Sequence, residues 1–480
     1  MMHSTVQSKQ QAILPVVLLV MFLSGACTQR PAGTEPLRLL GTDPLTAVSV
    51  TGYHEVLVTW MQRGLRNMTA VHAGPKDGLA FVPPARVKTI KDLLQNGGSG
   101  TDVGDLVTAD NYLFLAQRLG LIRRVFWVIP YHHVDYINAE LRVQAFLRNE
   151  TSHFSPQDVG SMRFRNGCVS GTLAGIEVHV CSPTTLPRLA EPAVVTIDPG
   201  FFPLYAANRG PSGLGATKEF FDLMAIKRIG TRAVSVAASP EFQGMRGYLS
   251  EEIVSILKDP EILQSTQPPD LWALREQADG MLTRGDVKEA AGHLEKHGAA
   301  FPADPYLHLM RWTAQALLSK RASALNALTA LCVKDPVLCS GIVDAGVLLR
   351  EQGDLAGAEE FLRKAVSLQQ LRPGRARREY AVTLYQAGKY ADAQREASPL
   401  VADPAYTVAG GLLLGDCAYA LQQNDEAVRR YEGALSSYRE AGGYRLSKRE
   451  QESISRLKSL YQRRNDKRGL RTLEGTPAFE

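Results

Sequence analysis

Between residues 40 and 260, short apolar runs alternate with longer stretches whose apolar positions recur at helical spacing. Short runs rich in β-branched residues are typical of buried strands, and helical spacing of apolar positions predicts helices. The strands predicted in this way are 68–73, 123–130, 193–200 and 231–240, and the helices are 87–95, 110–121, 217–230 and 250–259. Because strands and helices alternate, the pattern predicts a three-layer α/β domain over residues 40–260, with a mostly parallel sheet and helices on both faces.

After residue 271 the pattern changes to a repeat. Five six-residue segments share one frame, and their first residues lie 34, 34, 35 and 34 positions apart. Three of them begin with glycine, which ends a helix well because it adopts a left-handed backbone without strain. All five end in alanine, which lets two helices approach closely: Ala290, Ala324, Ala358, Ala393 and Ala427. This period predicts an all-α solenoid of stacked helix pairs.

The repeating frame resembles the tetratricopeptide repeat, a helix–turn–helix unit. We expect five repeats over residues 271–441, a linker over 261–270, and a capping helix with a tail over 442–480. The resemblance implies a protein or peptide partner bound in a concave groove, which the first helices of such units usually line. The groove candidates are Tyr306, Arg311, Arg350, Tyr380 and Tyr385. The alternative is that these side chains only pack or face solvent.

The N-terminal residues have the features of an export signal. Residues 11–27 combine an apolar core, too short to span a bilayer comfortably, with small residues before Cys27. The LSGAC ending resembles a bacterial lipobox, with Ser24 at a position where leucine is more usual. The resemblance implies removal of residues 1–26, lipid attachment to Cys27 and a tether over 27–39. The alternative is an ordinary signal peptide that leaves Cys27 as a free thiol.

The residue after the cysteine, Thr28, favours an outer-membrane lipoprotein on the periplasmic side of the cell envelope. The lipid anchor would then make the membrane a partner. The formal net charge is +5 and the basic residues form no long block, so nucleic acid is not an expected partner.

Export would place the other cysteines in an oxidising compartment. Cys168 and Cys181 bracket a predicted hairpin, and Cys332 and Cys339 flank a predicted helix–helix turn. Each pair is a candidate disulfide, and buried thiols are the alternative. Neither spacing is that of a structural zinc site.

A second resemblance rests on four segments of the α/β domain, which are YHEVLVTW (53–60), residues 70–94, residues 111–130, and VVTIDPGFF (194–202). Together they resemble a poorly characterised branch of the arginase/deacetylase fold that includes peptide arginases. In that family, carboxylates and a histidine bind two metal ions, usually manganese, which generate hydroxide for hydrolysis. The resemblance implies a site where the parallel strands end.

Most of the ligand positions hold other residues in this chain. Where the family has Asp-Ala-His, this chain has Gly-Pro-Lys at 74–76, followed by Asp77 and Gly78. On the later strand, one of three aspartate positions is kept, and the three residues there are Thr196, Asp198 and Gly200. Two metal ions need several anionic oxygens, and an ammonium group at a ligand position would repel them.

We therefore expect a degenerate, catalytically inactive site formed by Lys76, Asp77 and Asp198. A buried aspartate is costly unless it is paired. Lys76 lies at a position that should face Asp198, so the substitution pattern predicts that Lys76 supplies a positive charge to Asp198 in place of the metal.

A different metal site is the alternative. His132, His133 and Asp135 follow a predicted strand, and together with Asp77 and Asp198 they are candidate ligands of a single manganese or zinc ion. Adjacent histidines on an extended backbone point in opposite directions, so at most one of them can join Asp135.

Two functional hypotheses follow. The first is a membrane-anchored periplasmic lipoprotein without a cofactor, which acts as a protein-binding adaptor and carries a degenerate arginase-like domain. The second is a metal-dependent hydrolase that cleaves C–N bonds in peptides or guanidino groups.

Overall fold

The computed structural model describes residues 38–473 apart from short gaps at 51, 96–102, 104–105, 151–153, 210–212, 239–243, 265–269, 369–372, 404–405 and 441–445. The predicted signal peptide, Cys27 and nearly all of the tether lie outside the described residues, as does half of the linker. Among the helices within the described ranges, none is long and apolar enough to cross a membrane.

The described strands form one nine-stranded sheet, in the order β1-β9-β8-β3-β4-β7-β6-β5, with β2 also paired to β9. The strands are β1 (Arg38–Leu39), β2 (Ala47–Val50), β3 (Met68–Ala73), β4 (Ile122–Val128), β5 (Arg163–Arg165), β6 (Cys168–Leu173), β7 (Ile176–Cys181), β8 (Ala193–Ile197) and β9 (Gly230–Ala237). The pairs β2–β9, β9–β8, β8–β3, β3–β4 and β4–β7 are parallel. The pairs β1–β9, β7–β6 and β6–β5, at the two edges of the sheet, are antiparallel. The predicted strands correspond to β3, β4, β8 and β9.

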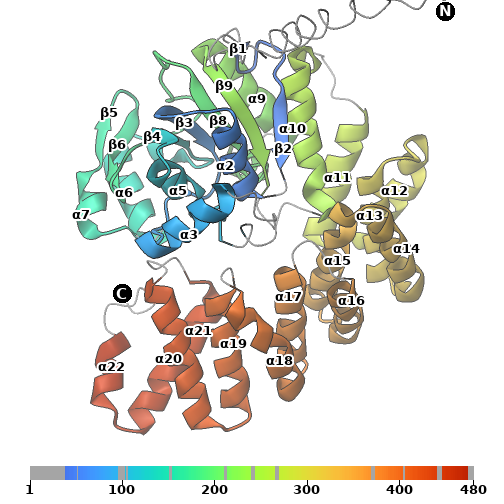
Figure 1. The fold of residues 1–480 in the computed structure, drawn as a ribbon. Helices are drawn as coiled ribbons and strands as arrows, with labels where there is room; N and C mark the ends of the chain where they lie inside the picture. Colours follow the sequence, from blue (N-terminus) through green and yellow to red (C-terminus); the bar gives the residue numbers. More distant parts are fainter. Residues whose placement is uncertain are drawn as a thin grey trace, which may run out of the picture. The chain divides into compact units, whose positions relative to one another are not determined.

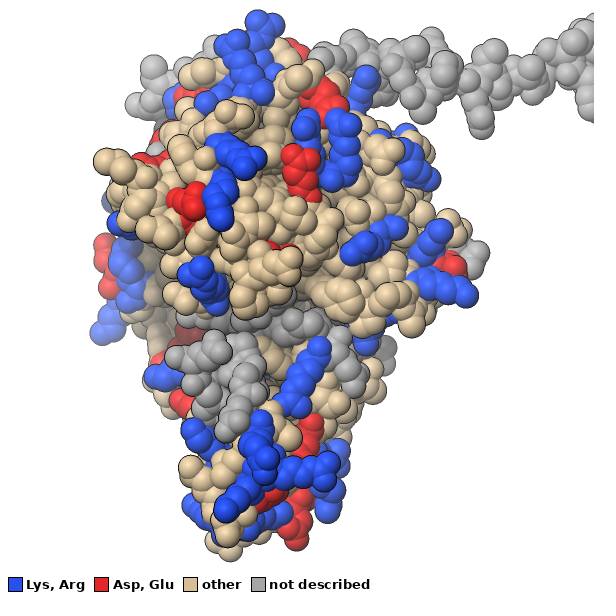
Figure 2. All heavy atoms as spheres, turned by 90° about the vertical axis from the view of Figure 1, so that its left-hand side faces the viewer, with Lys and Arg blue, Asp and Glu red and all other residues tan. Residues whose placement is uncertain are grey.

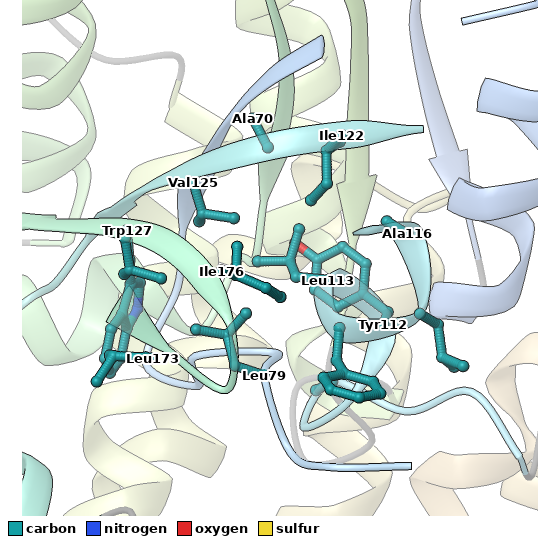
Figure 3. Packing of buried hydrophobic residues seen from close by; sticks show 14 of the residues in the cluster. Ala70, Leu79, Tyr112, Leu113, Ala116, Ile122, Val125, Trp127, Leu173 and Ile176 are labelled. Carbon is teal, nitrogen blue, oxygen red and sulfur yellow. The ribbon is translucent and has the colours of Figure 1, made fainter. Parts of the chain in front are cut away.

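Helices cover both faces of the sheet (Figure 1). They are α2 (Tyr53–Gln62), α3 (Pro84–Gln95), α5 (Tyr112–Arg118), α6 (Ala139–Glu150), α7 (Pro156–Ser161), α8 (Phe201–Arg209), α9 (Gly213–Lys227) and α10 (Tyr248–Lys258). Successive strand residues enter different cores, as the pleat requires: Ala70 packs with α2 and α5, whereas Val71 packs with α8 and α9. Figure 3 shows the first of these cores, where Trp127 and Ile176 from the sheet meet Leu113 of α5.

The rest of the described chain is helical. Its helices form six successive pairs, α11 (Asp270–Arg284) with α12 (Val287–His297), α13 (Pro305–Leu317) with α14 (Arg321–Lys334), α15 (Ser340–Glu351) with α16 (Leu355–Ser367), α17 (Pro373–Gln386) with α18 (Tyr390–Ala397), α19 (Thr407–Ala420) with α20 (Asn424–Glu440), and α21 (Lys448–Arg463) with α22 (Lys467–Leu473). The predicted helical repeat is thus present, and a sixth pair stands where one capping helix was expected. Short 3-10 helices fill several connections: η1 (His132–Val134), η3 (Gly244–Gly247), η4 (Pro260–Gln264), η5 (Gly298–Ala300), η6 (Pro336–Cys339) and η7 (Ser398–Ala402).

A residue with a left-handed backbone conformation connects the two helices of every described pair. The residue at the turn has a positive φ in all six described pairs, namely Gly285, Ser319, Gly353, Gly388, Gln422 and Asn465. The alanine that closes each predicted frame is fully buried in all five cases. In the sixth pair the equivalent residue, five positions after Asn465, is Leu470, which is only partly buried. The left-handed turn is thus common to all six described pairs, whereas the buried alanine belongs to the first five.

A buried ion cluster joins the α/β domain to the array. Arg275 of α11 is 3% exposed, and its guanidinium contacts Glu251 at 3.1 Å and Glu252 at 3.4 Å on α10, and also Asp304, the N-cap of α13. Apolar residues cross the same junction: Trp272 of α11 belongs to the α8–α10 core, and Tyr248 of α10 belongs to the core of the array. The two parts thus share a continuous packed interior.

We predict that Gly353→Ala lowers the free energy of unfolding by about 1 kcal/mol, the cost of a left-handed backbone for a residue with a Cβ. A Cβ at Gly353 would meet no atom within 4 Å, so the cost is purely conformational. Gly433→Ala in α20 is the control, because that Cβ also meets open space but the backbone is helical; it should stabilise by roughly 0.5–1 kcal/mol. Denaturant unfolding followed by circular dichroism measures the free energy of unfolding of both variants. Equal changes would contradict the claim that the left-handed backbone at Gly353 requires glycine.

Candidate functional site

The residues of the expected metal site do come together. Strands β3 and β8 are parallel neighbours, with His72 opposite Thr196 and Ala73 opposite Ile197. Both strands therefore end at the same edge of the sheet, where ligands of α/β proteins usually bind. The segments after them, 74–78 and 198–200, meet there, and the amide of Asp198 donates a hydrogen bond to the carbonyl of Ala73 at 2.8 Å.

Asp198 is fully buried and accepts hydrogen bonds from neutral groups. Its Oδ2 accepts from the Tyr53 hydroxyl at 2.6 Å, and its Oδ1 accepts from the amide of Gly200 at 2.8 Å. The side chain of Lys76 is 48% exposed and forms an ion pair with Asp110 at 3.3 Å. The Lys76–Asp198 partnership stays a prediction; the structure shows contacts of Lys76 with Asp110 and of Asp198 with Tyr53 and Gly200.

Asp77 has a structural role in the turn after β3. It is 5% exposed, and its Oδ1 accepts a hydrogen bond from the amide of Leu79 at 2.7 Å. Between them Gly78 has a φ of +69°, and a Cβ there would lie 2.9 Å from the ring of Tyr112. An aspartate, which the resembling family has at this position, would be strained and would collide with Tyr112.

His72 fills the space of another lost ligand. A Cβ on Gly74 would lie 2.5 Å from Cε1 and Nε2 of His72, so no aspartate fits at position 74 while the imidazole stays there. The ring lies 2.8 Å from the carbonyl of Lys76 through Nε2 and 2.9 Å from the Tyr112 hydroxyl through Nδ1. Burial lowers the pKa of His72 to about 4, so the ring is neutral at physiological pH. Nε2–H donates to the carbonyl, and Nδ1 accepts from Tyr112, whose own pKa burial raises.

This edge does not fit a two-metal centre. Among the described residues, no group of three or more His, Cys, Asp and Glu side chains is arranged to hold a metal ion. The two retained carboxylates are already engaged, and His72 and Tyr112 fill the space between the strand ends. We therefore derive no hydrolytic step from this site.

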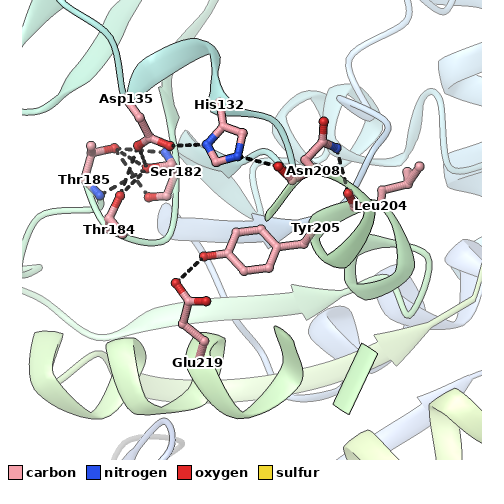
Figure 4. A network of polar contacts seen from close by, with 9 residues as sticks. All are labelled: His132, Asp135, Ser182, Thr184, Thr185, Leu204, Tyr205, Asn208 and Glu219. Carbon is pink, nitrogen blue, oxygen red and sulfur yellow. Dashed lines mark hydrogen bonds and ion pairs between the residues drawn. The ribbon is translucent and has the colours of Figure 1, made fainter. Parts of the chain in front are cut away.

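The alternative ligands belong to a separate polar network (Figure 4). His132 lies 3.2 Å from Asp135 through Nδ1 and 2.8 Å from the carbonyl of Asn208 through Nε2, so both ring nitrogens face protein atoms. Asp135 also accepts from the hydroxyl of Ser182 at 2.6 Å. His133 points elsewhere, with its ring 4.9 Å from that of Phe146. One histidine joins Asp135, as expected, but the pair ties loops together and offers no free ring nitrogen to a metal.

Two disulfides are present in the structure, Cys168–Cys181 and Cys332–Cys339. The first joins β6 to β7, and the second joins the end of α14 to η6. Cys417 is a buried free thiol, and burial raises its pKa to about 12, so it stays protonated and unreactive.

The predicted groove residues lie in different environments. Tyr306 is 7% exposed and packs against Gly247 and Arg275 at the junction, so the structure corrects its assignment to an open groove. Arg350 forms an ion pair with Glu379 at 2.7 Å. Arg311 is exposed beside Trp312. Tyr380 and Tyr385 are half-buried on α17.

A cavity beside Arg449, between the first helices of the last three pairs, was not predicted from the sequence. This small cavity of about 20 Å³ lies between α17, α19 and α21, next to Arg378, Asp416 and Arg449. Both terminal nitrogens of Arg449 are buried without a hydrogen-bond partner in the part of the chain that the structure describes, and the guanidinium lies 5.2 Å from the ring of Tyr385. The pKa of Arg449 is lowered, first by burial; the charge of Asp416 acts in the opposite direction, and the charge of Arg378 lowers the pKa again.

Two carboxylates of the described chain line this cavity, Asp416 and Glu450, and both accept hydrogen bonds from other groups. Glu450 accepts from the amide and the hydroxyl of Ser447, each at 2.7 Å. Asp416 is 1% exposed and accepts from Tyr431 at 2.7 Å, from Ser453 at 2.8 Å and from Arg456 at 2.7 Å. One sequence signal could have drawn attention to Arg449: it lies in the first turn of α21, where the helix dipole disfavours a cation.

No protein-family model and no curated protein matches this chain. Among solved structures, the chain is similar to MamA, with a TM-score of 0.28 and 17% identity over 36% of this chain and 95% of MamA. It is also similar to PilF of Pseudomonas aeruginosa, with a TM-score of 0.29 and 18% identity over 42% of this chain and 86% of PilF. A kinesin light chain of Podosopora anserina with TPR-like repeats gives a TM-score of 0.27 and 19% identity over 36% of this chain and 97% of that protein. At these TM-scores the similarities carry no conclusion about the function of this chain.

Tyr53→Phe should lower the free energy of unfolding by about 1–3 kcal/mol, because it removes a donor from a carboxylate that water cannot reach. Tyr205→Phe is the matched control. Its hydroxyl donates to Glu219 at 2.9 Å, and that carboxylate is only partly buried, so the loss should stay below about 1 kcal/mol. Chemical denaturation of both variants measures the difference. Equal losses would show that the hydrogen bond from Tyr53 to Asp198 stabilises the protein no more than the one from Tyr205 to Glu219.

Proposed function

We propose that the protein is a binding protein whose helix array docks an acidic segment of a partner protein at Arg449 and Arg378. The observation that carries this proposal is the buried guanidinium of Arg449, which has no hydrogen-bond partner among the described residues. Desolvating such a group costs free energy unless an anion or acceptor compensates it. A ligand carboxylate would form charge-assisted hydrogen bonds there.

The size of the cavity limits what can enter it. A volume of about 20 Å³ slightly exceeds the roughly 10–15 Å³ that one water molecule needs. It therefore accepts one oxygen of a carboxylate, such as the end of an aspartate or glutamate side chain or a chain terminus, while the rest of the partner lies outside against α17, α19 and α21.

The charge around the site favours an acidic partner. Residues 446–473 contain nine Lys and Arg but only three Asp and Glu. Lys and Arg side chains gather over these C-terminal helices on the face drawn in Figure 2. Such a field raises the association rate of an acidic segment and makes binding sensitive to salt.

In this proposal the α/β domain is a degenerate arginase-like domain that does not catalyse hydrolysis. The resemblance over 53–202 supports the family assignment, and the substitution of ligand positions by Gly74, Lys76 and Gly78 supports the loss of activity. His72 in the space of a ligand supports it as well. No contact among the described residues favours the C–N hydrolase.

Arg449→Met should weaken binding of a fluorescent glutamate hexapeptide by about tenfold or more, because it removes a charge-assisted hydrogen bond worth about 1.5–3 kcal/mol. Fluorescence anisotropy at low and moderate salt measures the affinity. The same variant should be as stable as the parent or more stable, because the buried arginine has no hydrogen bond to lose.

Arg456→Met is the control on the same helix. It should lower the free energy of unfolding by about 1–3 kcal/mol, since Asp416 loses its cation, and it should change peptide affinity less than Arg449→Met does. The proposal fails if Arg449→Met leaves the affinity unchanged, or if the hexapeptide does not bind saturably.

We further propose that the chain is attached to the outer membrane through acylated Cys27. The apolar segment 11–27 and the LSGAC ending support this, and two disulfides are in keeping with an oxidising compartment. Cys27→Ser should abolish incorporation of an alkyne-labelled fatty acid in a bacterial host and move the protein from the membrane fraction to the soluble one. Continued labelling of the variant would refute acylation at Cys27.

A further inference from the structure

The helix layer leaves part of the sheet uncovered. Helices α8 and α9 pack on β9, β8 and β3, and farther along the same face a cleft of about 520 Å³ lies over β4, β7 and β6. The loop 187–190 and the start of β6 border the cleft. This volume falls within the range of roughly 300–1,000 Å³ that is typical of small-molecule sites.

The floor of the cleft consists of cross-strand rows. Phe126 of β4 is opposite His179 of β7, which is opposite Ser170 of β6. In the next row Arg124 is opposite Glu177. Alternate residues of a strand face the same side, so both rows point into the cleft.

Several interactions fix this floor. The ring of His179 stacks on that of Phe126, with centroids 4.4 Å apart. The disulfide Cys168–Cys181 joins β6 to β7, one row beyond the row that contains Ser170 and His179. Arg124 is held from behind by the Thr69 hydroxyl at 3.0 Å and by Glu191. The floor is thus pre-organised rather than a set of mobile surface side chains.

Among the described residues, one carboxylate lines the cleft, that of Glu177, and it already accepts a hydrogen bond. The Ser170 hydroxyl lies 2.8 Å from Nδ1 of His179, and Nε2 lies 3.0 Å from Glu177. Burial lowers the pKa of His179, which keeps the ring neutral. Nδ1 then accepts from Ser170, and Nε2–H donates to Glu177.

The arginines around the cleft are left with a positive excess. Arg124, Arg165 and Arg188 all line it. Arg188 contacts only a backbone carbonyl, that of Ile226 at 3.5 Å, and Arg165 has no hydrogen bond or ion pair within the described ranges. Guanidinium groups beside the apolar side chains of Phe126, Pro187 and Leu189 suit an anion carried on an apolar body.

We propose that this cleft binds a small organic anion, a carboxylate or phosphate monoester attached to an apolar group. The anionic end lies between Arg165 and Arg188, and the apolar body rests against Phe126, Pro187 and Leu189. The site is independent of the array and of the strand-end cluster around Asp198.

The test uses the full-length protein and calorimetric titration with 1-naphthyl phosphate and 2-naphthoate. We expect saturable binding of at least one of these anions and no binding of neutral 2-naphthol. Arg165→Met/Arg188→Met should weaken the binding about tenfold or more. Arg66→Met/Arg86→Met removes two exposed arginines elsewhere. It is the charge-matched control and should leave the affinity for the anion within about twofold.

The location is checked by the His179 ring signals in NMR, which should shift with the anion in the control and not in the Arg165/Arg188 double variant. Two results would overturn the proposal: equal affinity in both double variants, or binding of 2-naphthol as tight as that of the anions. Arg449→Met should leave anion binding intact, so failure at the array and failure at the cleft can be told apart.

Discussion

The guanidinium of Arg275 holds the two parts of this molecule in one packed interior. Three carboxylates surround it, of which Glu252 and Asp304 are buried. Burial raises the pKa of Glu252 to about 8, although the charge of Arg275 acts in the opposite direction. At neutral pH, Glu252 is therefore mostly protonated, and Arg275 is balanced by Glu251 and Asp304. A fully ionised cluster would place three negative charges around one positive charge in a site with little water, which is unfavourable.

A second polar cluster, at the ends of β3 and β8, follows a similar rule. In both places a neutral donor or a proton helps to stabilise a buried carboxylate. At Asp198 the donors are Tyr53 and the amide of Gly200. Filling the strand edge with His72 and Tyr112 turns a place where α/β proteins usually bind ligands into packed interior. The two proposed binding sites lie elsewhere, one on the uncovered face of β4, β7 and β6 and the other between α17, α19 and α21.

The elements of the fold could be predicted because their signals are local. Four strands and four helices of the α/β domain follow from apolar runs and helical spacing, and the repeat frame places the turn of each of the first five helix pairs. The sixth pair was missed because Leu470 stands at the alanine position and the spacing to it is longer, so the frame is not visible. The antiparallel edge strands are short, and their pairing depends on contacts far along the chain.

The site was harder to predict, since it depends on where side chains point. The resemblance to the arginase/deacetylase fold singles out Gly74 as a position where that family has a ligand, but only the structure shows that the His72 ring occupies the space beside it. Lys76 was expected to face Asp198, and the structure shows its long side chain in an ion pair with Asp110 at the surface. Arg449 and Arg165 look like ordinary polar residues in the sequence. Arg449 stands out because its guanidinium is buried without a hydrogen-bond partner among the described residues. Arg165 stands out because it borders the cleft over the uncovered face of the sheet.

The junction at Arg275 has a consequence for how the array moves. A repeat array is stabilised mainly by contacts between neighbouring pairs, so it frays from whichever end is free. Here the first end is held, because Trp272 is packed into the α/β core and Tyr248 into the core of the array. Opening fluctuations should therefore concentrate in the pairs farthest from Arg275, which include α19 and α21. The helices that surround Arg449 would then be the most compliant part of the array, able to adjust to a partner while the α/β domain stays rigid.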